Sequence, residues 1–262
     1  MKLENRTVLI TGGSDGIGLE TAKLFVENGA NVIITGRGKS KLDKAVKEIG
    51  VNATAIQSDA SNLNDLDLLY QTIVEQYKKI DGLFVNAGMV IGSHISEVTE
   101  QQFDEQITLN LKGAYFTVQK ALPLLKDQSV IVLNASTAGI IGIKGLSVYS
   151  ATKAAMINLA KTLAADLAER QIRVNAISPS YTATPLALEL NQGNIENVNA
   201  MIPFQQRFAE PIEMAKTVLY LMSDDTSYMT GQNIIVDAGL TPSAKPPPKA
   251  VRIAKAMPLQ EL

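Results

Sequence analysis

Tyr149 and Lys153 are four residues apart in a segment with helical apolar spacing, so both side chains lie on one face of the predicted helix. A free tyrosine titrates near pH ~10, too high for a base at neutral pH. One cation about 5 Å away, at an effective dielectric of ~20, contributes roughly 3 kcal/mol. We therefore expect Lys153 to lower the pKa of Tyr149 toward the range of a general acid–base catalyst. Such a pair is usually only a surface contact, so the hypothesis depends on its neighbours.

A serine and a glycine-rich turn supply two such neighbours. Ser136 follows the apolar run 129–134 and could hold a substrate oxygen against Tyr149, although a serine at a strand end is normally a turn or capping residue. Residues 11–18 (TGGSDGIG) follow the apolar run Thr7–Thr11. Their glycines would let main-chain N–H groups approach a pyrophosphate at a helix N-terminus. The spacing is G-x-x-x-G-x-G rather than G-x-G-x-x-G, so the turn alone is a weak indication of a dinucleotide site.

Short apolar runs alternate with longer amphipathic segments along the chain, which predicts an α/β fold. The predicted strands are Thr7–Thr11, 31–35, 53–58, 82–86, 129–134, 173–178 and 233–237. The predicted helices are 16–28, Lys39–Ile49, Leu63–Tyr77, 100–125, 148–170 and 211–223. Continuous apolar strands separated by helices are typical of a doubly wound, Rossmann-type parallel sheet with helices on both faces. In such a sheet the glycine-rich turn, Ser136 and Tyr149 all lie at the crevice where ligands bind.

The chain divides into one domain and a short tail. Residues 1–241 contain every predicted helix and strand, and residues 242–262 hold five of the ten prolines. The run PPP at 246–248 favours an extended polyproline segment. The tail could contact a neighbouring subunit, or it could be solvated and dispensable.

Composition excludes several classes of site. The chain has 262 residues, a net charge of −2, no cysteine and a single histidine, His94. It therefore lacks disulfides, thiolate metal sites and zinc sites with two imidazoles, and we expect no bound metal. No G-x-S-x-G elbow accompanies His94, which argues against a Ser-His-Asp hydrolase. No basic field favours nucleic acid, and neither a membrane span nor a signal-peptide core is present, so we expect a soluble protein of the cytoplasm.

Together the turn, Asn86-Ala87-Gly88 after the fourth predicted strand, Ser136 and the motif Tyr149-x-x-x-Lys153 resemble the short-chain dehydrogenase/reductase family. The resemblance covers residues 5–241. It implies a seven-stranded sheet of order 3-2-1-4-5-6-7 and hydride transfer between a nicotinamide cofactor and a secondary alcohol or ketone. Tyr149 would be the general acid–base, Ser136 would bind the substrate oxygen, and Asn110 would relay protons from Lys153 through water.

The resemblance also implies a cofactor site. Its predicted residues are Gly12, Ser14, Asp15, Ile17, Gly18, Gly36, Arg37, Asp59, Ala60, Asn86, Ala87, Gly88, Tyr149, Lys153, Pro179, Thr182 and Thr184. Within this set Asp59 would contact the adenine, and Thr182 and Thr184 would face the nicotinamide amide. Two positions depart from the family pattern, because Val85 replaces an asparagine and Ser180 replaces a glycine. Neither change removes a chemical group that the reaction needs.

The end of the second predicted strand bears on the choice of cofactor. An NAD site generally has an acid there, which hydrogen-bonds the ribose 2′-hydroxyl. Gly36 stands at that position, and Arg37 follows with a charged planar fork suited to a 2′-phosphate. Asp15 argues the other way, because many NADP-using relatives have a basic residue there. The sequence predicts NADP(H) as the preferred cofactor, with NAD(H) as the alternative.

Other functions and partners stay open at the level of sequence. The chain could bind the cofactor without turnover, or it could be a nucleotide-sugar epimerase or dehydratase, although those enzymes add a C-terminal substrate domain. Predicted pocket residues are mostly apolar: Met89, Val90, Ile91, Ile140, Ile141, Tyr181 and Leu186. They favour medium-sized hydrophobic ketones or alcohols. Residues 186–190 (LALEL) could be a buried helix face or a mobile lid over the substrate. The helices 100–125 and 148–170 are expected to pack in a homotetramer, or alternatively in a dimer.

Overall fold

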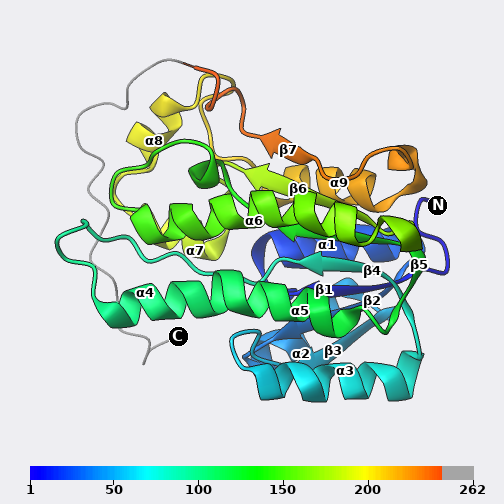
Figure 1. Ribbon diagram of the computed structural model, residues 1–262. Coiled ribbons are helices and arrows are strands. Elements are labelled where there is room, and N and C mark those ends of the chain that lie inside the picture. Colours follow the sequence, from blue (N-terminus) through cyan, green and yellow to red (C-terminus); the bar gives the residue numbers. More distant parts are fainter. Residues whose placement is uncertain (244–262) are drawn as a thin grey trace.

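The computed structural model describes residues 1–243 as a parallel sheet between two layers of helices (Figure 1). The sheet has seven strands in the order β3-β2-β1-β4-β5-β6-β7. The strands are β1 (Thr7–Thr11), β2 (Asn31–Gly36), β3 (Ala53–Gln57), β4 (Ile80–Val85), β5 (Leu125–Asn134), β6 (Arg173–Pro179) and β7 (Asn233–Val236). All pairings are parallel. The predicted doubly wound fold and its strand order are therefore confirmed. The predicted tail, apart from residues 242–243, lies outside the described residues.

Nine α-helices lie within residues 1–243; those after β1, β2 and β3 agree closely with the predicted bounds, whereas α8 was not predicted. They are α1 (Gly16–Glu27), α2 (Lys39–Ile49), α3 (Leu63–Tyr77), α4 (Glu100–Ile107), α5 (Ala114–Ala121), α6 (Ser147–Asp166), α7 (Pro185–Leu190), α8 (Ile195–Met201) and α9 (Pro211–Met222). Short 3-10 turns follow β5, α6 and α9. Within residues 1–243 no helix combines the length and the apolar character needed to cross a membrane.

Two predicted helix boundaries are wrong. The segment 100–125 is not one helix, because the π-helix η1 (Thr108–Gly113) separates α4 from α5 and Leu125 already begins β5. The wider turn of a π-helix is not visible in an apolar repeat, and such turns often occur at functional sites. Helix α6 ends at Asp166, and a 3-10 turn (Ala168–Arg170) follows it.

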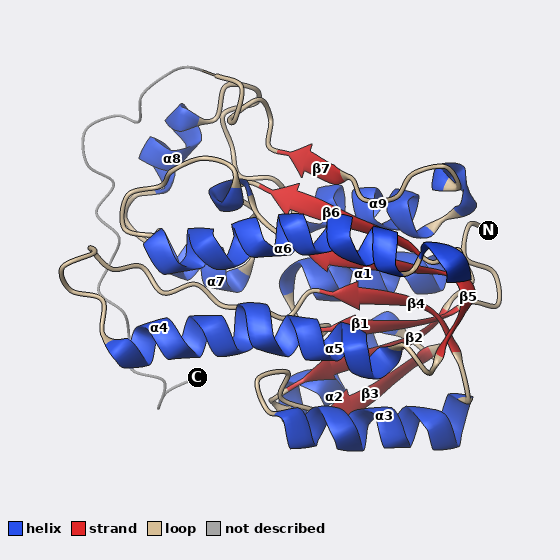
Figure 2. Ribbon diagram, in the orientation of Figure 1, coloured by secondary structure: helices blue, strands red, loops and turns tan. Residues whose placement is uncertain are grey.

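Each face of the sheet carries its own hydrophobic core (Figure 2). On one face, buried residues of α3, α5 and α6 pack on the sheet, among them Leu69, Val118 and Met156. On the other face α1, α2 and α9 do so through residues that include Phe25, Leu42 and Met214. Since both faces are covered, the strands are apolar throughout, and the polar groups of the site lie where the strands end. All the strand arrows in Figure 2 point to one end of the molecule, where α7 and α8 lie.

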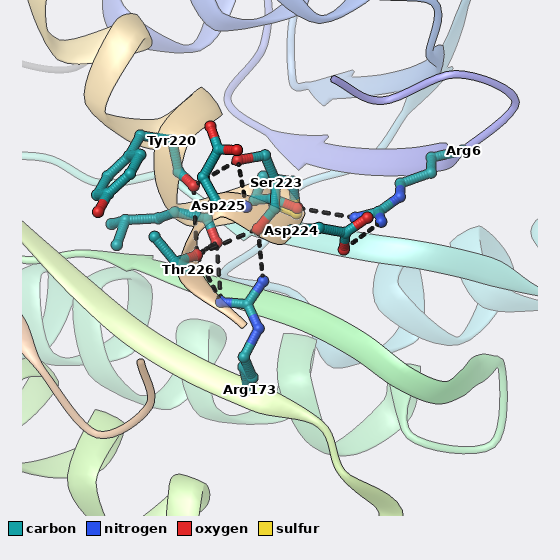
Figure 3. A network of polar contacts seen from close by, with 9 residues as sticks. Arg6, Arg173, Tyr220, Ser223, Asp224, Asp225 and Thr226 are labelled. Carbon is teal, nitrogen blue, oxygen red and sulfur yellow. Dashed lines mark hydrogen bonds and ion pairs between the residues drawn. The ribbon is translucent and has the colours of Figure 1, made fainter. Parts of the chain in front are cut away.

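Arg6 and Arg173 bind the C-terminal end of α9, at the edge of the sheet where the strands begin (Figure 3). The last carbonyl groups of a helix have no partner within the helix. At the end of α9 the Arg173 guanidinium donates to the carbonyl oxygens of Leu221 (3.1 Å) and Ser223 (2.9 Å). Arg6 donates to the carbonyl oxygen of Met222 at 3.0 Å. The two side chains thereby tie α9 to the starts of β1 and β6, far from the glycine-rich turn.

Candidate active site

The glycine-rich turn between β1 and α1 has a shape that only glycine permits. Gly12 and Gly16 have φ angles of +64° and +54°. A Cβ atom at Gly18 would lie 2.1 Å from the carbonyl oxygen of Gly12, which is far inside van der Waals contact. At Gly12, Gly16 and Gly18 the turn therefore exposes its main chain at the start of α1, and we call this surface the cradle. This geometry fits the pyrophosphate of a dinucleotide.

Asn86, directly after β4, holds that turn through hydrogen bonds of its side chain. Its amide nitrogen donates to the carbonyl oxygens of Thr11 (3.0 Å) and Gly12 (2.9 Å). The hydroxyl of Thr11 in turn accepts from the main-chain N–H groups of Asn86 and Ala87. The side chain of Asn86 thus holds the cradle in place. Its direct contact with a cofactor stays a prediction.

A chain of hydrogen bonds joins Lys153 to the turn. Lys153 Nζ donates to the main-chain oxygen of Asn134 at 2.7 Å, and the Asn134 amide donates to Asn86 Oδ1 at 2.9 Å. Sequence reasoning missed Asn134. The available signal was a polar residue that ends a buried strand two positions before Ser136. Asn134 fixes Lys153 and Asn86 relative to each other across β4 and β5.

Ser136, Tyr149 and Lys153 come together as predicted. The Lys153 nitrogen lies 5.6 Å from the centre of the Tyr149 ring. Burial lowers the pKa of Lys153 to about 8. Burial also raises the pKa of Tyr149, and a hydrogen bond with Ser136 lowers it only in part. The expected net lowering of the Tyr149 pKa is therefore wrong for this structure, because the loss of hydration outweighs the lowering by the Ser136 hydrogen bond.

Asn110 lies in η1 beside this triad, with 2% of its surface exposed. Its side-chain oxygen accepts from Met89 N, and its amide nitrogen donates to Met89 O, each at 2.8 Å. The same amide nitrogen lies 3.3 Å from the hydroxyl of Thr152. Both polar atoms of the amide are thus engaged with protein. The side chain supports the loop after β4, and the predicted proton relay through water stays a prediction.

The segment after β6 reaches back to the turn. Pro179 is the buried last residue of β6. Thr182 is 4% exposed, and its hydroxyl donates to the carbonyl oxygen of Ser180, so its polar group serves its own loop. Thr184 caps α7, and its methyl group would lie 2.9 Å from a Cβ atom at Gly16. Thr184 is therefore at the cradle.

Helix α7 lies on the surface beside the same cradle. No residue of α7 is buried, so the expected buried helix face is wrong, and the lid stays a prediction.

The predicted adenine end is formed by the segment after β3. The Asp59 carboxylate accepts hydrogen bonds from the main chain and hydroxyl of Ser61, so one of its oxygens is already used. The carbonyl oxygen of Ala60 lies so close to Gly113 that a Cβ atom there would come within 2.2 Å. The contacts of both residues with a cofactor stay predictions.

The end of β2 presents Arg37 to solvent. In residues 1–243 the Arg37 guanidinium makes no hydrogen bond and no ion pair, whereas Lys39 pairs with Asp43 at 3.6 Å. Gly36 is adjacent to Ser14, whose hydroxyl would lie 3.3 Å from a Cβ atom at position 36. Asp15 is the N-cap of α1, but its carboxylate makes no capping hydrogen bond. The Arg37 guanidinium and the Ser14 hydroxyl therefore lie near the position where an NAD site generally has an acidic side chain.

The single histidine takes no part in this arrangement. His94 is exposed in the loop after β4, and its ring contacts the hydroxyl of Ser96 at 2.8 Å. Over the described part of the chain, no three His, Cys, Asp or Glu side chains are placed to hold a metal ion.

Comparisons with known proteins agree with this geometry. A family model described as "Enoyl-(Acyl carrier protein) reductase" matches residues 12–241. A crystal structure from Brucella melitensis, described as a short-chain dehydrogenase/reductase (glucose/ribitol dehydrogenase), superposes with a TM-score of 0.87 and 32% identity. It covers 91% of this chain and 98% of its own. The chain belongs to the short-chain dehydrogenase/reductase family.

Two other relatives of this dehydrogenase/reductase bear on its chemistry. The 3-oxoacyl-(acyl-carrier-protein) reductase of Thermotoga maritima is 37% identical over 245 residues, which are 92% of this chain and 99% of that protein. The 3-ketoacyl-(acyl-carrier-protein) reductase of Brucella melitensis, solved with NADH, has a TM-score of 0.86 and 31% identity, with coverage of 91% and 99%. The present dehydrogenase/reductase is accordingly an oxidoreductase of carbonyl or hydroxyl groups that uses an NAD(P)(H) cofactor.

Proposed function

We propose that this enzyme interconverts a secondary alcohol and a ketone, with Tyr149 as general acid–base. The observation that carries the proposal is the convergence of Ser136, Tyr149 and Lys153 next to the cradle of Gly12 and Gly18. The hydrogen-bond chain through Asn134 and Asn86 joins these two parts of the site. A proton donor and a cofactor site are thereby held at one edge of the sheet, as carbonyl reduction needs.

The residues divide the work as follows. Ser136 binds the substrate oxygen and holds it against the Tyr149 hydroxyl, which gives or takes the proton. When bound, the nicotinamide carries the hydride, and its positive charge in the oxidised form favours the tyrosinate. The pKa of Lys153, about 8, is close to physiological pH, so this lysine can accept or return a proton at a small cost in free energy.

A panel of carbonyl compounds tests the proposal. Purified enzyme is mixed with NADPH or NADH and with ethyl acetoacetate, acetoacetyl thioesters, cyclohexanone, aldoses and nucleotide sugars, and loss of absorbance at the reduced cofactor's band is followed. We expect turnover of one or more ketones. Tight binding of cofactor without turnover of any carbonyl compound would favour a binding protein instead. Conversion of a nucleotide sugar without net cofactor oxidation would favour an epimerase or dehydratase.

The substrate class proposed is a medium-sized apolar 3-oxo compound. Exposed apolar side chains on the 3-10 turn after β5 and on α7 support it, because Ile140 and Leu186 are 42% and 40% exposed. The Thermotoga and Brucella relatives carry names of 3-oxoacyl reductases. Faster turnover of ethyl acetoacetate than of aldoses is the expected result.

Preference for NADP(H) over NAD(H) is part of the same proposal. Arg37 supports it, since a solvent-facing guanidinium with no partner in residues 1–243 can pair with a 2′-phosphate without breaking an existing contact. Ser14 offers a hydroxyl at the same place. The opposing observations are Asp15 and the NADH bound to the Brucella relative. The ratio of kcat/KM with the two reduced cofactors decides between them.

We also propose a homotetramer, with a dimer as the alternative, in the cytoplasm. Phe103 on α4 and Tyr115 on α5 are 47% and 46% exposed, and this apolar surface on the two helices supports their packing against another subunit. Light scattering at micromolar concentration tests the assembly, and a monomer would contradict it. Fractionation of the cells of origin tests the location.

A further inference from the structure

A second buried carboxamide lies one helical turn before Asn110. Gln106 is on α4, and 1% of its surface is exposed. Nothing in the proposed chemistry of Ser136, Tyr149 and Lys153 uses it. A glutamine is rarely buried so completely unless its amide is satisfied by hydrogen bonds. Its partners therefore indicate what it does.

One partner of Gln106 lies in the loop that leaves β4, and the other lies on α4 itself. The Gln106 side-chain oxygen accepts from the main-chain N–H of Ile91 at 3.1 Å, and its nitrogen donates to the carbonyl oxygen of Gln102 at 3.2 Å. Asn110 holds Met89 in the same loop through two hydrogen bonds of 2.8 Å. The main-chain N–H of Ser93 donates to the carbonyl oxygen of Gly145 at 2.9 Å.

The spacing of these contacts has a simple cause. In an extended chain the N–H groups of alternate residues point the same way. Residues 89, 91 and 93 are each fastened through such an N–H group, so the loop runs as an extended ribbon. Gln106 supplies the middle attachment. Without it, the ribbon would be held only at Met89 and at Ser93 among these three points.

The ribbon forms one wall of the active site. A Cβ atom at Gly88, where the ribbon begins, would lie 3.5 Å from Lys153 Nζ. Gly145, which anchors its other end, is four residues before Tyr149. A shallow depression beside the ribbon is lined by residues that include Ile91, Gln106, Gly145 and Val148, the last of which precedes Tyr149. A shift of the ribbon would therefore alter the surroundings of Lys153 at one end and of Val148 at the other.

We propose that Gln106 is a positioning residue: by holding Ile91 it sets the substrate-side wall of the site, while the cofactor cradle does not depend on it. This inference rests on the proposed carbonyl reduction for its kinetic consequence. The structural part, the fastening of residues 88–93 by Gln106, can be measured without turnover.

The experiment compares three variants on the full chain. Gln106→Met keeps the side-chain length but has no acceptor for Ile91, and Gln106→Glu keeps an acceptor oxygen. Gln101→Met is the matched control, because Gln101 is exposed on the same helix and, within residues 1–243, its side chain bonds to Glu105 alone. For each protein, amide hydrogen exchange of residues 88–93 and 12–18, the Kd of NADPH and NADH, and KM and kcat for ethyl acetoacetate are measured.

We expect Gln106→Met to speed exchange in residues 88–93 at least tenfold and to leave residues 12–18 and the cofactor Kd within twofold. KM should rise at least fivefold with a smaller change in kcat. Gln106→Glu should recover most of the protection, and Gln101→Met should match the wild type. Unchanged exchange in residues 88–93, or equal acceleration in residues 12–18, would overturn the inference. If the wild type turns over no carbonyl compound, the proposed function fails, and the exchange pattern still decides the role of Gln106.

Discussion

Lys153 Nζ lies 2.7 Å from the main-chain oxygen of Asn134, so this lysine is fixed by the last residue of β5. An ammonium group this deeply buried has one carbonyl partner and lacks most of its hydration. That is why its pKa falls to about 8 from an ordinary value of 10.5. The same placement brings it next to Tyr149, so its low pKa and its catalytic position have one structural cause.

The lowered pKa of Lys153 makes stability depend on pH. The unfolded chain keeps the lysine proton up to about pH 10.5, whereas the folded protein releases it near pH 8. Between these values the unfolded state binds more protons, so the free energy of unfolding rises with pH, by about 3 kcal/mol in total. Lys153→Met should lack this rise. Urea unfolding of both proteins at several pH values between 7 and 10.5 checks it, and parallel profiles would contradict it.

Tyr149→Phe should lower kcat by about 10²- to 10⁴-fold, the usual contribution of a general acid–base, because it removes only the hydroxyl. The Kd of NADPH, followed by fluorescence, should change little. Ser136→Ala should also lower kcat and should shift the apparent pKa of Tyr149 upward, since the Ser136 hydrogen bond lowers that pKa. A Tyr149→Phe enzyme with wild-type kcat would exclude Tyr149 as the proton donor.

Gly18→Ala should abolish binding of both NADPH and NADH, because the new methyl group would lie 2.1 Å from the Gly12 carbonyl oxygen and would force the turn open. Gly142→Ala is the matched control. A Cβ atom at Gly142 meets nothing within 4 Å, so binding should be unchanged. Calorimetric titration with each cofactor measures the effect. Normal affinity in Gly18→Ala would show that the turn is not the cofactor cradle.

Arg37→Ala should weaken NADPH binding by roughly 1.5–3 kcal/mol, the range for hydrogen bonds with charged groups. NADH binding should hardly move, because NADH has no 2′-phosphate. Lys41→Ala, an exposed basic residue on α2, is the control for general electrostatic attraction. A higher kcat/KM with NADH in the wild type, or equal loss of both cofactors in Arg37→Ala, would show that Arg37 does not read the 2′-phosphate.

Arg173→Met should destabilise the fold by about 1–3 kcal/mol and leave cofactor affinity unchanged. The substitution removes hydrogen bonds to the carbonyl oxygens of Leu221 and Ser223 at the end of α9 (Figure 3). Arg37→Met, at an exposed arginine, should leave the melting temperature within a degree or two. Thermal unfolding monitored by circular dichroism compares the three proteins. An unchanged melting temperature in Arg173→Met would mean that water replaces these contacts without loss.

The order of helices and strands follows from local signals in the sequence. The bounds of α2 and α3 match the prediction residue for residue, because their apolar repeat and flanking glycine or asparagine are local features. The parallel sheet follows from continuous apolar strands, and the meeting of the glycine-rich turn, Ser136 and Tyr149 follows from strands that end at one edge. The sequence by itself therefore determines which side chains meet at the candidate site.

The tertiary structure decided how those groups are held and charged. The π-helix at Asn110 and the grip of Gln106 on Ile91 depend on packing against a loop some 15 to 21 residues away in the chain. Asn134 acts only because β5 pairs with β4, which brings Asn86 within reach, and because α6 packs on the sheet, which brings Lys153 to it. The pKa of Tyr149 depends on the balance between burial, which raises it, and the hydrogen bond with Ser136, which lowers it, and residue spacing reports neither. Hydration is lost through contacts from every side, so only the folded arrangement sets that balance.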